Sequence, residues 1–383
     1  MRLFPIILYL IAVTLGTFSG GTWAALGIAG GGILFLGTWL KERRLAPLYM
    51  PYMIAVLGTL AAIALLNLAA SNPAISWHML LQEATIMLPL ALFFHPRVIA
   101  QVEPPKLFPV ITLAASVAAI AYGLECALGY PMLHGVKGAI VEYTEYNRGI
   151  SYLAVFAFPM MAYVWVCQPR WRFAVFILLM LIPVMLTESR ATRMAFIAGL
   201  AVTALAHYAP KLMQRGLIAV LVALITMPFV VTHLFTEHPQ WVERLPMSWH
   251  HRVEIWDYMS YRIFERPWFG WGIGSSHLLS FEQPHGQLYQ MVHTAASHPH
   301  NAILQLWVET GLPGLIIGIA AAIAVLRNIA RLAAPYVPFA MGAWAACLCI
   351  SLVAYSFWDD SLFALFALTS LAFILLSNHA KQS

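Results

Sequence analysis

Long apolar runs separated by short polar breaks dominate the chain. Most of these runs are close to the ~20 residues that an α-helix needs to cross a bilayer, and none shows the alternating pattern of a membrane β-strand. We therefore predict an all-α polytopic membrane protein with about twelve transmembrane helices in a single integral membrane domain, 1–383. The predicted spans lie near 4–18, 21–39, 48–70, 76–94, 108–128, 149–167, 172–187, 193–209, 216–235, 301–326, 338–356 and 361–378. We expect the first run to be a retained helix and not a cleaved signal peptide.

One polar segment, 236–300, is much longer than the other breaks. It is rich in tryptophan, which gathers at membrane–water interfaces. Within it, Val253, Trp256 and the Tyr258-Met259 pair approximate the stripe of an apolar helix face. The pattern predicts that this loop contains an amphipathic helix lying on the membrane surface.

Composition supports a membrane protein. Hydrophobic residues make up 61% of the chain and charged residues 10%, against roughly 25% charged in soluble proteins. The four cysteines fall in apolar runs, so neither a disulfide framework nor a thiolate metal site is indicated. The basic residues are scattered among the loops, and we expect no nucleic-acid partner.

The distribution of these basic residues predicts the orientation. With twelve spans, most of those in short loops fall on one side, which the positive-inside rule makes cytoplasmic. Both termini then lie in the cytoplasm, and 236–300 lies on the outer side. The residues on the predicted cytoplasmic side are Lys41, Arg43, Arg44, Arg97, Lys106, Arg170, Arg172, Lys211, Arg215, Arg327 and Arg331, with Arg2 and Lys381 near the termini.

Candidate chemistry concentrates where 236–300 enters the next apolar run, at His298-Pro299-His300-Asn301. Pro299 suits a first helical turn, and Gly311 with Pro313-Gly314 is expected to relax or kink the helix. A helix N-terminus favours a neutral histidine, so His300 is a candidate general base, with a hydrogen-bonded interface histidine as the alternative. His298 and His300 could chelate a metal, but no carboxylate pair or thiolate completes a closed site, and we predict no metal.

Arg190 lies between two apolar spans with almost no loop. An arginine near the membrane interior costs on the order of 2.5–3.5 kcal/mol, so it usually has an anionic partner. That partner is either Glu188 or a lipid headgroup, or a phosphate bound by both arms of the guanidinium. Arg193 is a helper or an interface anchor.

Arg252 is the second candidate phosphate ligand, and its alternative is a pair with Glu254 or Asp257 on a solvated face. The glycine-rich turn at 267–274 follows, with backbone N–H groups that could meet an anion. Arg148, before the sixth span, could assist a phosphate or anchor its helix.

Two acidic positions have structural interpretations. Glu309 is expected to be a hydrogen-bonded core residue with Gln305, four positions earlier. Asp359-Asp360 could bind an acceptor or a cation, although a helix cap is favoured.

An ordered set of motifs resembles the O-antigen ligase/polymerase superfamily, and within it the ligases that act on lipid A-core. The set covers roughly 187–314 and consists of Thr187-Glu188-Ser189-Arg190, Arg252 with Trp256, Pro267-x-x-Gly270-x-Gly272-x-Gly274, and His300-Asn301-x-x-Leu304-Gln305-x-x-x-Glu309-x-Gly311. The resemblance implies a GT-C-like, metal-independent, inverting glycosyltransferase of the Gram-negative inner membrane, with its active site in the periplasm and no cofactor.

The resemblance also implies substrates and roles. The donor would be O-antigen on undecaprenyl diphosphate, the acceptor a sugar of the lipid A-core oligosaccharide, and membrane lipids would surround both. Arg190 and Arg252 would hold the diphosphate, and His300 would be the base. Candidate supporting residues are Arg148, Arg193, Arg266, His298 and Asn301. An O-antigen polymerase or a transporter of lipid-linked sugars remains an alternative.

Overall fold

The computed structural model describes residues 4–42, 51–100, 102–137, 144–279 and 298–382. Within these ranges the regular structure is α-helix or 3-10 helix. This agrees with the all-helical prediction.

Within the described residues every predicted span coincides with helical structure, although the run 216–235 is divided among α11, η2 and α12. The helices are α1 (Phe4–Phe18), α2 (Gly21–Glu42), α3 (Pro51–Leu66), η1 (Asn67–Ala69), α4 (Pro73–Leu92), α5 (Pro96–Ala100), α6 (Pro104–Ala127), α7 (Pro131–Lys137), α8 (Thr144–Cys167), α9 (Arg170–Leu186), α10 (Arg190–Tyr208), α11 (Pro210–Ala223), η2 (Leu224–Thr226), α12 (Met227–Glu237), α13 (Pro239–Glu243), α14 (Met247–Glu265), η3 (Ser276–Leu278), α15 (Ala302–Ile329), η5 (Ala334–Tyr336), α16 (Val337–Val353) and α17 (Asp360–Gln382).

Several of these helices are long and apolar enough to cross a membrane, so the protein is a polytopic membrane protein. Among the described residues, 6 segments meet both criteria, and Ile6–Phe18 and Pro51–Asn67 are shorter apolar helices. The 6 segments are Pro104–Ala127, Tyr146–Cys167, Pro210–Leu234, Ala302–Ile329, Ala334–Val353 and Asp360–Gln382. The larger number of about twelve crossings stays a prediction.

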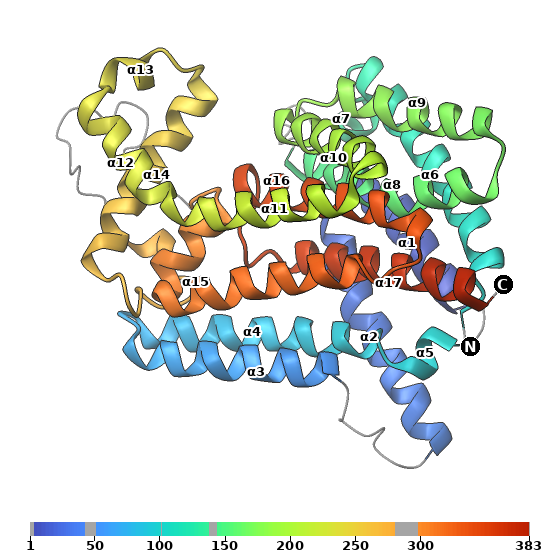
Figure 1. Cartoon of the computed structure of the whole chain (residues 1–383), viewed down its shortest axis with the longest axis horizontal. Coiled ribbons are helices and arrows are strands. Elements are labelled where there is room, and N and C mark those ends of the chain that lie inside the picture. The colour runs from blue at the N-terminus through green and yellow to red at the C-terminus, as the bar shows by residue number, and fades with distance from the viewer. Residues whose placement is uncertain (1–3, 43–50, 101, 138–143, 280–297, 383) are drawn as a thin grey trace.

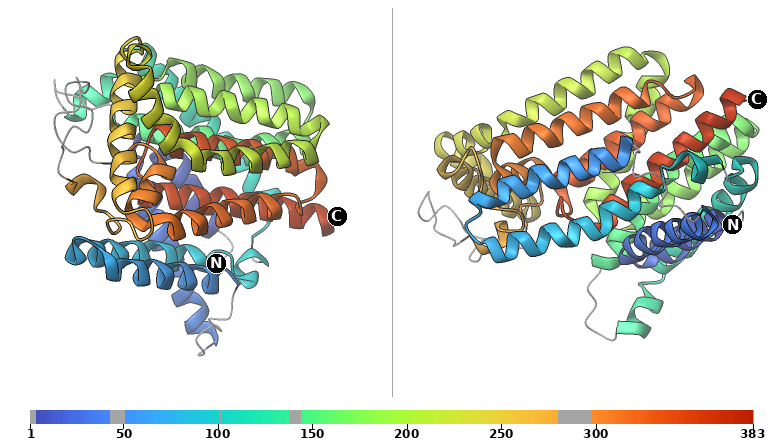
Figure 2. Two further views of the ribbon diagram at one scale, coloured as in Figure 1. Left: turned by 60° about the vertical axis from the view of Figure 1, so that its left-hand side comes forward. Right: turned by 90° about the horizontal axis from the view of Figure 1, so that it is seen from below.

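The helices α3, α4, α11 and α15 run in nearly the same direction, and α12, α13 and α14 gather at one end of the bundle (Figure 1). The rotated views show the same grouping (Figure 2). Both termini lie at the opposite end (Figure 1), as an even number of crossings requires.

The prediction that 236–300 carries an amphipathic helix on the membrane surface is wrong for α14. Residues 253–260 of α14 are all buried, because the helix packs against α12, α13 and α15. Its polar residues face protein partners: the Trp256 indole donates to the Pro299 carbonyl, and His250 pairs with Glu254 at 3.0 Å. Polar side chains that are satisfied inside the fold therefore gave the sequence its amphipathic pattern.

The expected kink in α15 is confirmed at Gly311, whose φ of 68° and ψ of −175° are outside the helical region. A side chain there would collide with the backbone of Trp268 and Phe269. Pro299, in contrast, does not occupy the first turn, because Asn301 is the N-cap and α15 begins at Ala302.

Candidate functional site

The C-terminus of α16 is where the candidate residues meet. The last carbonyls of a helix have no partner within it and carry partial negative charge. Here Leu352, Val353 and Ala354 offer theirs to three residues from distant parts of the chain. Asn301 Nδ2 donates to Leu352 O at 3.3 Å, Arg252 Nε donates to Val353 O at 3.0 Å, and His300 Nδ1 lies 2.8 Å from Ala354 O. Arg252 and His300 are thus held on adjacent carbonyls.

This contact determines the tautomer of His300. The Ala354 carbonyl can only accept, so Nδ1 carries the proton and Nε2 keeps a lone pair. Burial lowers the pKa of His300 to about 4, and the charge of His298 when protonated and that of Arg252 act in the same direction. The sequence predicted a neutral imidazole because of the helix dipole, whereas in the structure burial is the main cause.

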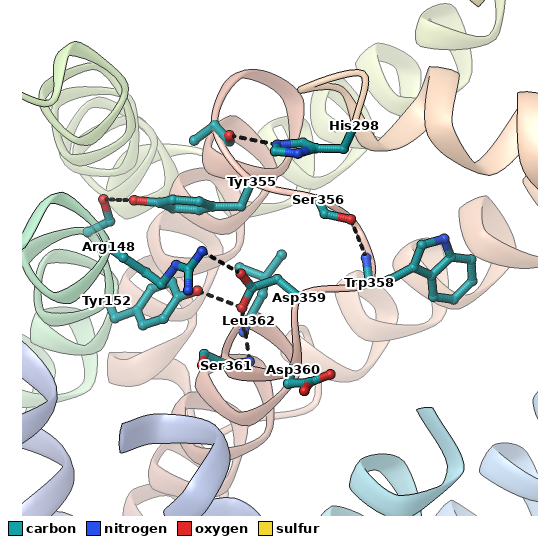
Figure 3. A network of polar contacts seen from close by, with 12 residues as sticks. Arg148, Tyr152, His298, Tyr355, Ser356, Trp358, Asp359, Asp360, Ser361 and Leu362 are labelled. Atoms are coloured by element: carbon teal, nitrogen blue, oxygen red, sulfur yellow. Dashed lines mark hydrogen bonds and ion pairs between the residues drawn. The ribbon is translucent and has the colours of Figure 1, made fainter. Parts of the chain in front are cut away.

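His298 lies against His300, with ring centroids 4.0 Å apart. Its Nε2 points to the same Ala354 carbonyl at 3.4 Å (Figure 3). Burial lowers the pKa of His298 as well. The two rings therefore form a neutral pair on one acceptor.

Arg252 does not form the ion pair that was considered as its alternative. Its Nη1 donates to Ser248 O at 2.7 Å, while Glu254 pairs with His250 and is buried. Of its guanidinium nitrogens, Nη2 makes no hydrogen bond with a residue in the described ranges. The guanidinium is fixed by backbone carbonyls, and a cation at the α16 C-terminus is electrostatically favourable.

Arg148 approaches the same connection from α8. Its Nη2 lies 3.4 Å from Asp359 Oδ2, and its guanidinium lies 5.6 Å from the centre of the Tyr355 ring. The Tyr152 hydroxyl donates to the other Asp359 oxygen at 3.0 Å (Figure 3). Asp359 also accepts from the Ser361 and Leu362 N–H groups, which confirms the cap expected at the start of α17.

Arg190 is exposed at the first residue of α10. It makes no ion pair with Glu188 or with any other residue that the structure describes, so the Glu188 alternative is wrong. A cation at a helix N-terminus opposes the dipole, so helix stability does not explain this arginine.

A hydrogen-bond chain links the start of α10 to the α16–α17 connection. Ser189 Oγ accepts from Thr192 Oγ1 at 2.7 Å, Thr192 contacts Ser151 Oγ, and Ser151 Oγ lies 3.0 Å from the Tyr355 hydroxyl. Tyr355 follows Ala354, the partner of His300. The chain thus fixes the helix end that carries Arg190 relative to the residues that hold His300.

The other candidate supporting residues have structural contacts. Arg193 donates to Thr187 O at the end of α9. Asn301 Oδ1 caps α15 by accepting from Ile303 and Leu304 N–H. Arg266 lies over the Trp271 ring at 4.4 Å, and because it is 14 residues beyond Arg252 along α14 it lies roughly 20 Å away.

The N–H groups of the glycine-rich turn are not open to an external anion. Trp271 N and Gly272 N donate to the Val308 and Glu309 carbonyls at the kink of α15, at 2.9 and 2.8 Å. Gly274 N donates at 2.8 Å to the buried Glu309 carboxyl group. The same carboxyl group accepts from the Gln305 and Trp358 side chains. The expectation for Glu309 is confirmed, and the anion that meets this turn is Glu309 itself.

Sequence reasoning missed the α16–α17 connection as an organising element. Tyr152, Ser151 and Tyr355 lie in or beside apolar runs and carry no motif. The available signal was the polar break Ser356–Ser361, which was noted only for its acidic pair. The helix that ends just before it supplies the carbonyls.

The described residues contain no group of three or more His, Cys, Asp or Glu side chains arranged for a metal ion. Two further histidines that precede His298 in the same polar segment, His285 and His293, also invite a metal interpretation from the sequence, and they lie outside the described residues. The expectation that no metal is used stays a prediction.

Comparison with known proteins places part of the chain in a family context. Residues 175–319 match the profile of the family described as O-antigen ligase. The matched range contains Arg190, Arg252 and His300. A protein of Rickettsia conorii, named as a candidate polysaccharide ligase, is 33% identical over 84 residues, which are 21% of this chain and 20% of that protein. The chain therefore matches about a fifth of the length of this curated relative.

Proposed function

We propose that the chain is a lipid-linked-oligosaccharide-dependent glycosyltransferase of the O-antigen ligase type. It moves a glycan from a polyprenyl diphosphate to a sugar hydroxyl in lipopolysaccharide biosynthesis. The observation that carries this proposal is the placement of Arg252 and His300 on the adjacent carbonyls of Val353 and Ala354. The family match over 175–319 supports it.

The leaving group accounts for the arginines. As the bond between the anomeric carbon and the diphosphate oxygen breaks, negative charge grows on the phosphate. Arg252, through Nη2, and the exposed Arg190 stabilise that charge, because guanidinium N–H groups form charge-assisted hydrogen bonds with phosphate oxygens. Arg148 has its charge partly offset by Asp359 and acts as a positioning residue.

The acceptor accounts for His300. Its Nε2 takes the proton of the attacking sugar hydroxyl while the new carbon–oxygen bond forms opposite the departing diphosphate, so the anomeric centre inverts. General-base catalysis of this kind typically contributes 10²–10⁴-fold. A pKa near 4 keeps the imidazole unprotonated at neutral pH. The proton comes from the acceptor, and the energy comes from the diphosphate linkage.

The substrates follow from the family. We propose undecaprenyl diphosphate-linked O-antigen as donor and lipid A-core oligosaccharide as acceptor, both embedded in the Gram-negative inner membrane. About twelve crossings, cytoplasmic termini and a periplasmic site complete the proposal. This orientation is supported by the basic residues of the short loops and by the position of both termini at the end of the bundle opposite α12–α14 (Figure 1).

The test is reconstitution of the purified protein in vesicles with both lipids present and a chelator added. Transfer of the polymer onto lipid A-core supports the ligase. Lengthening of the glycan on its polyprenyl carrier would instead identify a polymerase with the same leaving group. Passage of intact lipid-linked donor across the bilayer without transfer would identify a transporter.

A further inference from the structure

An apolar groove runs between α15 and α17. α15 packs on α16 and α3, whereas α17 packs on α16 and α4. Figure 1 shows α15 and α17 lying along each other. The space between them has a volume of about 630 Å³, within the range of sites that bind small molecules. Its lining is mostly apolar and includes Leu306, Ala322, Trp344, Phe363 and Phe373.

One end of the groove is cationic. Arg331 and Lys381 line it there, beside Asn328 and Asn378. The Lys381 ammonium donates to the Arg331 carbonyl at 3.0 Å, and Arg331 Nη1 donates to Asn328 Oδ1 at 3.2 Å, so the two cations are held together. Among the described residues that line the groove none is acidic, and neither cation forms an ion pair within the described part of the chain. The two charges are therefore uncompensated by the protein.

The cationic end is far from the proposed transfer site. α15 begins at Ala302, two residues after His300, and ends at Ile329, two residues before Arg331. A helix of this length extends about 40 Å, more than the ~30 Å hydrocarbon core of a bilayer. Lys381 is in the last turn of α17, whose end is the C-terminus marked in Figure 1, and it is hydrogen-bonded to Arg331. Both cations thus lie at the membrane face opposite His300.

We propose that this groove is a binding site for an anionic glycerophospholipid of the leaflet on that side. Its phosphate group lies between Arg331 and Lys381, and an acyl chain lies along the apolar lining. A soluble anion would leave the apolar walls without a partner, and a lipid with a neutral headgroup would leave the two cations without one. Only a ligand with one anionic end and a long apolar body complements both halves.

Occupancy has a consequence for the protein. Asn301 and His300 lie at the start of α15. On the side of α15 that faces the groove, the acyl chain packs against the helix in place of α17. A ligand that binds only the folded protein stabilises the folded state relative to the unfolded state. The bound lipid stabilises the helix that positions the transfer site.

The test measures lipid binding by the detergent-purified, delipidated protein in native mass spectrometry. Phosphatidylglycerol and phosphatidylcholine with identical acyl chains are titrated separately. A basic residue near an anionic headgroup strengthens binding by about fivefold, so two give a preference of about 25-fold for phosphatidylglycerol. The double variant Arg331→Gln, Lys381→Gln is expected to lose that preference. Arg215→Gln, on exposed α11 and outside the groove, is the matched control and should retain it.

A second variant tests the apolar half. Ala322→Trp fills the groove and is expected to weaken both lipids alike, with unchanged elution on size exclusion as the check on folding. Equal binding of the two lipids by the unaltered protein would overturn the proposal, as would an undiminished preference in the double variant. Displacement of bound phosphatidylglycerol by undecaprenyl phosphate would also overturn it, because the groove would then belong to a polyprenyl chain.

Discussion

His300 Nδ1 lies 2.8 Å from the carbonyl oxygen of Ala354, and this contact leaves Nε2 as the basic atom of the ring. The carbonyl belongs to the end of α16, whereas His300 precedes α15. The tautomer of the proposed base is therefore set by a segment more than fifty residues away in the sequence. A main-chain acceptor at this point makes the arrangement independent of the side chain at 354.

The pH dependence of transfer should reflect a depressed histidine pKa. An ordinary histidine would become protonated, and so inactive as a base, below about pH 6.5. Burial lowers the pKa of His300 to about 4, so the acid limb of kcat/KM should fall only as the pH approaches that value. The measurement is kcat/KM for the acceptor between pH 4 and pH 8.

The His298→Gln variant supplies the control for this profile. His298, once protonated in the acid range, lowers the pKa of His300, so its replacement should move the acid limb to higher pH. An acid limb near 6.5 in the unaltered protein would contradict the assigned environment of His300.

Substitutions of Arg252 and Arg190 should lower donor kcat/KM if these residues bind the diphosphate. Arg252→Ala is expected to lower kcat/KM for the donor by about 10- to 100-fold, since a hydrogen bond to a charged group contributes roughly 1.5–3 kcal/mol. Arg252→Lys should restore little, because one ammonium group cannot keep both carbonyl contacts and also place a donor where Nη2 lies. Arg190→Ala should lower donor use without changing stability, because the exposed Arg190 side chain makes no hydrogen bond or ion pair within the described residues.

Arg266→Ala is the matched control for Arg252→Ala, since both residues lie at α14 and Arg266 stacks on Trp271 at its far end. Its donor kinetics should be unaltered. An equal loss of donor kcat/KM in Arg266→Ala and Arg252→Ala would count against the assignment of the diphosphate to Arg252.

The hydrogen-bonded hydroxyl groups from Ser189 to Tyr355 should help to position Arg190 and should not take part in the transfer step itself. Tyr355→Phe removes the hydroxyl that contacts Ser151 but keeps the ring beside Arg148. We expect a rise in donor KM of several-fold with little change in kcat, because Arg190 would be held less firmly. Steady-state kinetics with varied donor measure this split. A fall in kcat alone would mean that Tyr355 acts directly on the reaction.

Gly311 should be intolerant of a side chain. Its φ of 68° with ψ of −175° is a conformation that essentially only glycine adopts, and replacement costs on the order of 1–3 kcal/mol before any collision is counted. Gly311→Ala should therefore lower the Tm of the purified protein. Gly58→Ala, where an added Cβ meets nothing within 4 Å, is the matched control and should leave the Tm unchanged or slightly raised.

The sequence allowed the helices and much of the local chemistry to be predicted. Apolar runs located the helical segments, and the side-chain rules for Gln305 with Glu309 and for Asp359 as a cap were local enough to be correct. The kink at Gly311 followed from glycine and proline in one turn. These features depend on residues a few positions apart.

The arrangement of the site depends on contacts that no local pattern encodes. The alternative to phosphate binding for Arg252 is an acidic partner on its own helix, yet Arg252 binds the carbonyl of Val353, 101 positions away. The apolar stripe of Val253, Trp256 and Tyr258-Met259 predicts that α14 lies on the membrane surface. The polar residues of the same helix, His250, Glu254 and Asp257, are nevertheless buried. Backbone acceptors at a helix end have no signature in the side-chain sequence, and therefore the meeting point at α16 became visible only in three dimensions.

The most direct test of the account measures donor binding and transfer in one variant, His300→Ala. The geometry assigns the diphosphate to the arginines and the acceptor proton to His300 Nε2. We therefore predict that the purified variant binds the polyprenyl diphosphate-linked glycan with unchanged Kd, while its rate of transfer to lipid A-core falls by about 10²- to 10⁴-fold. Retained transfer in this variant, or lost donor binding with transfer unaffected at saturation, would contradict the account.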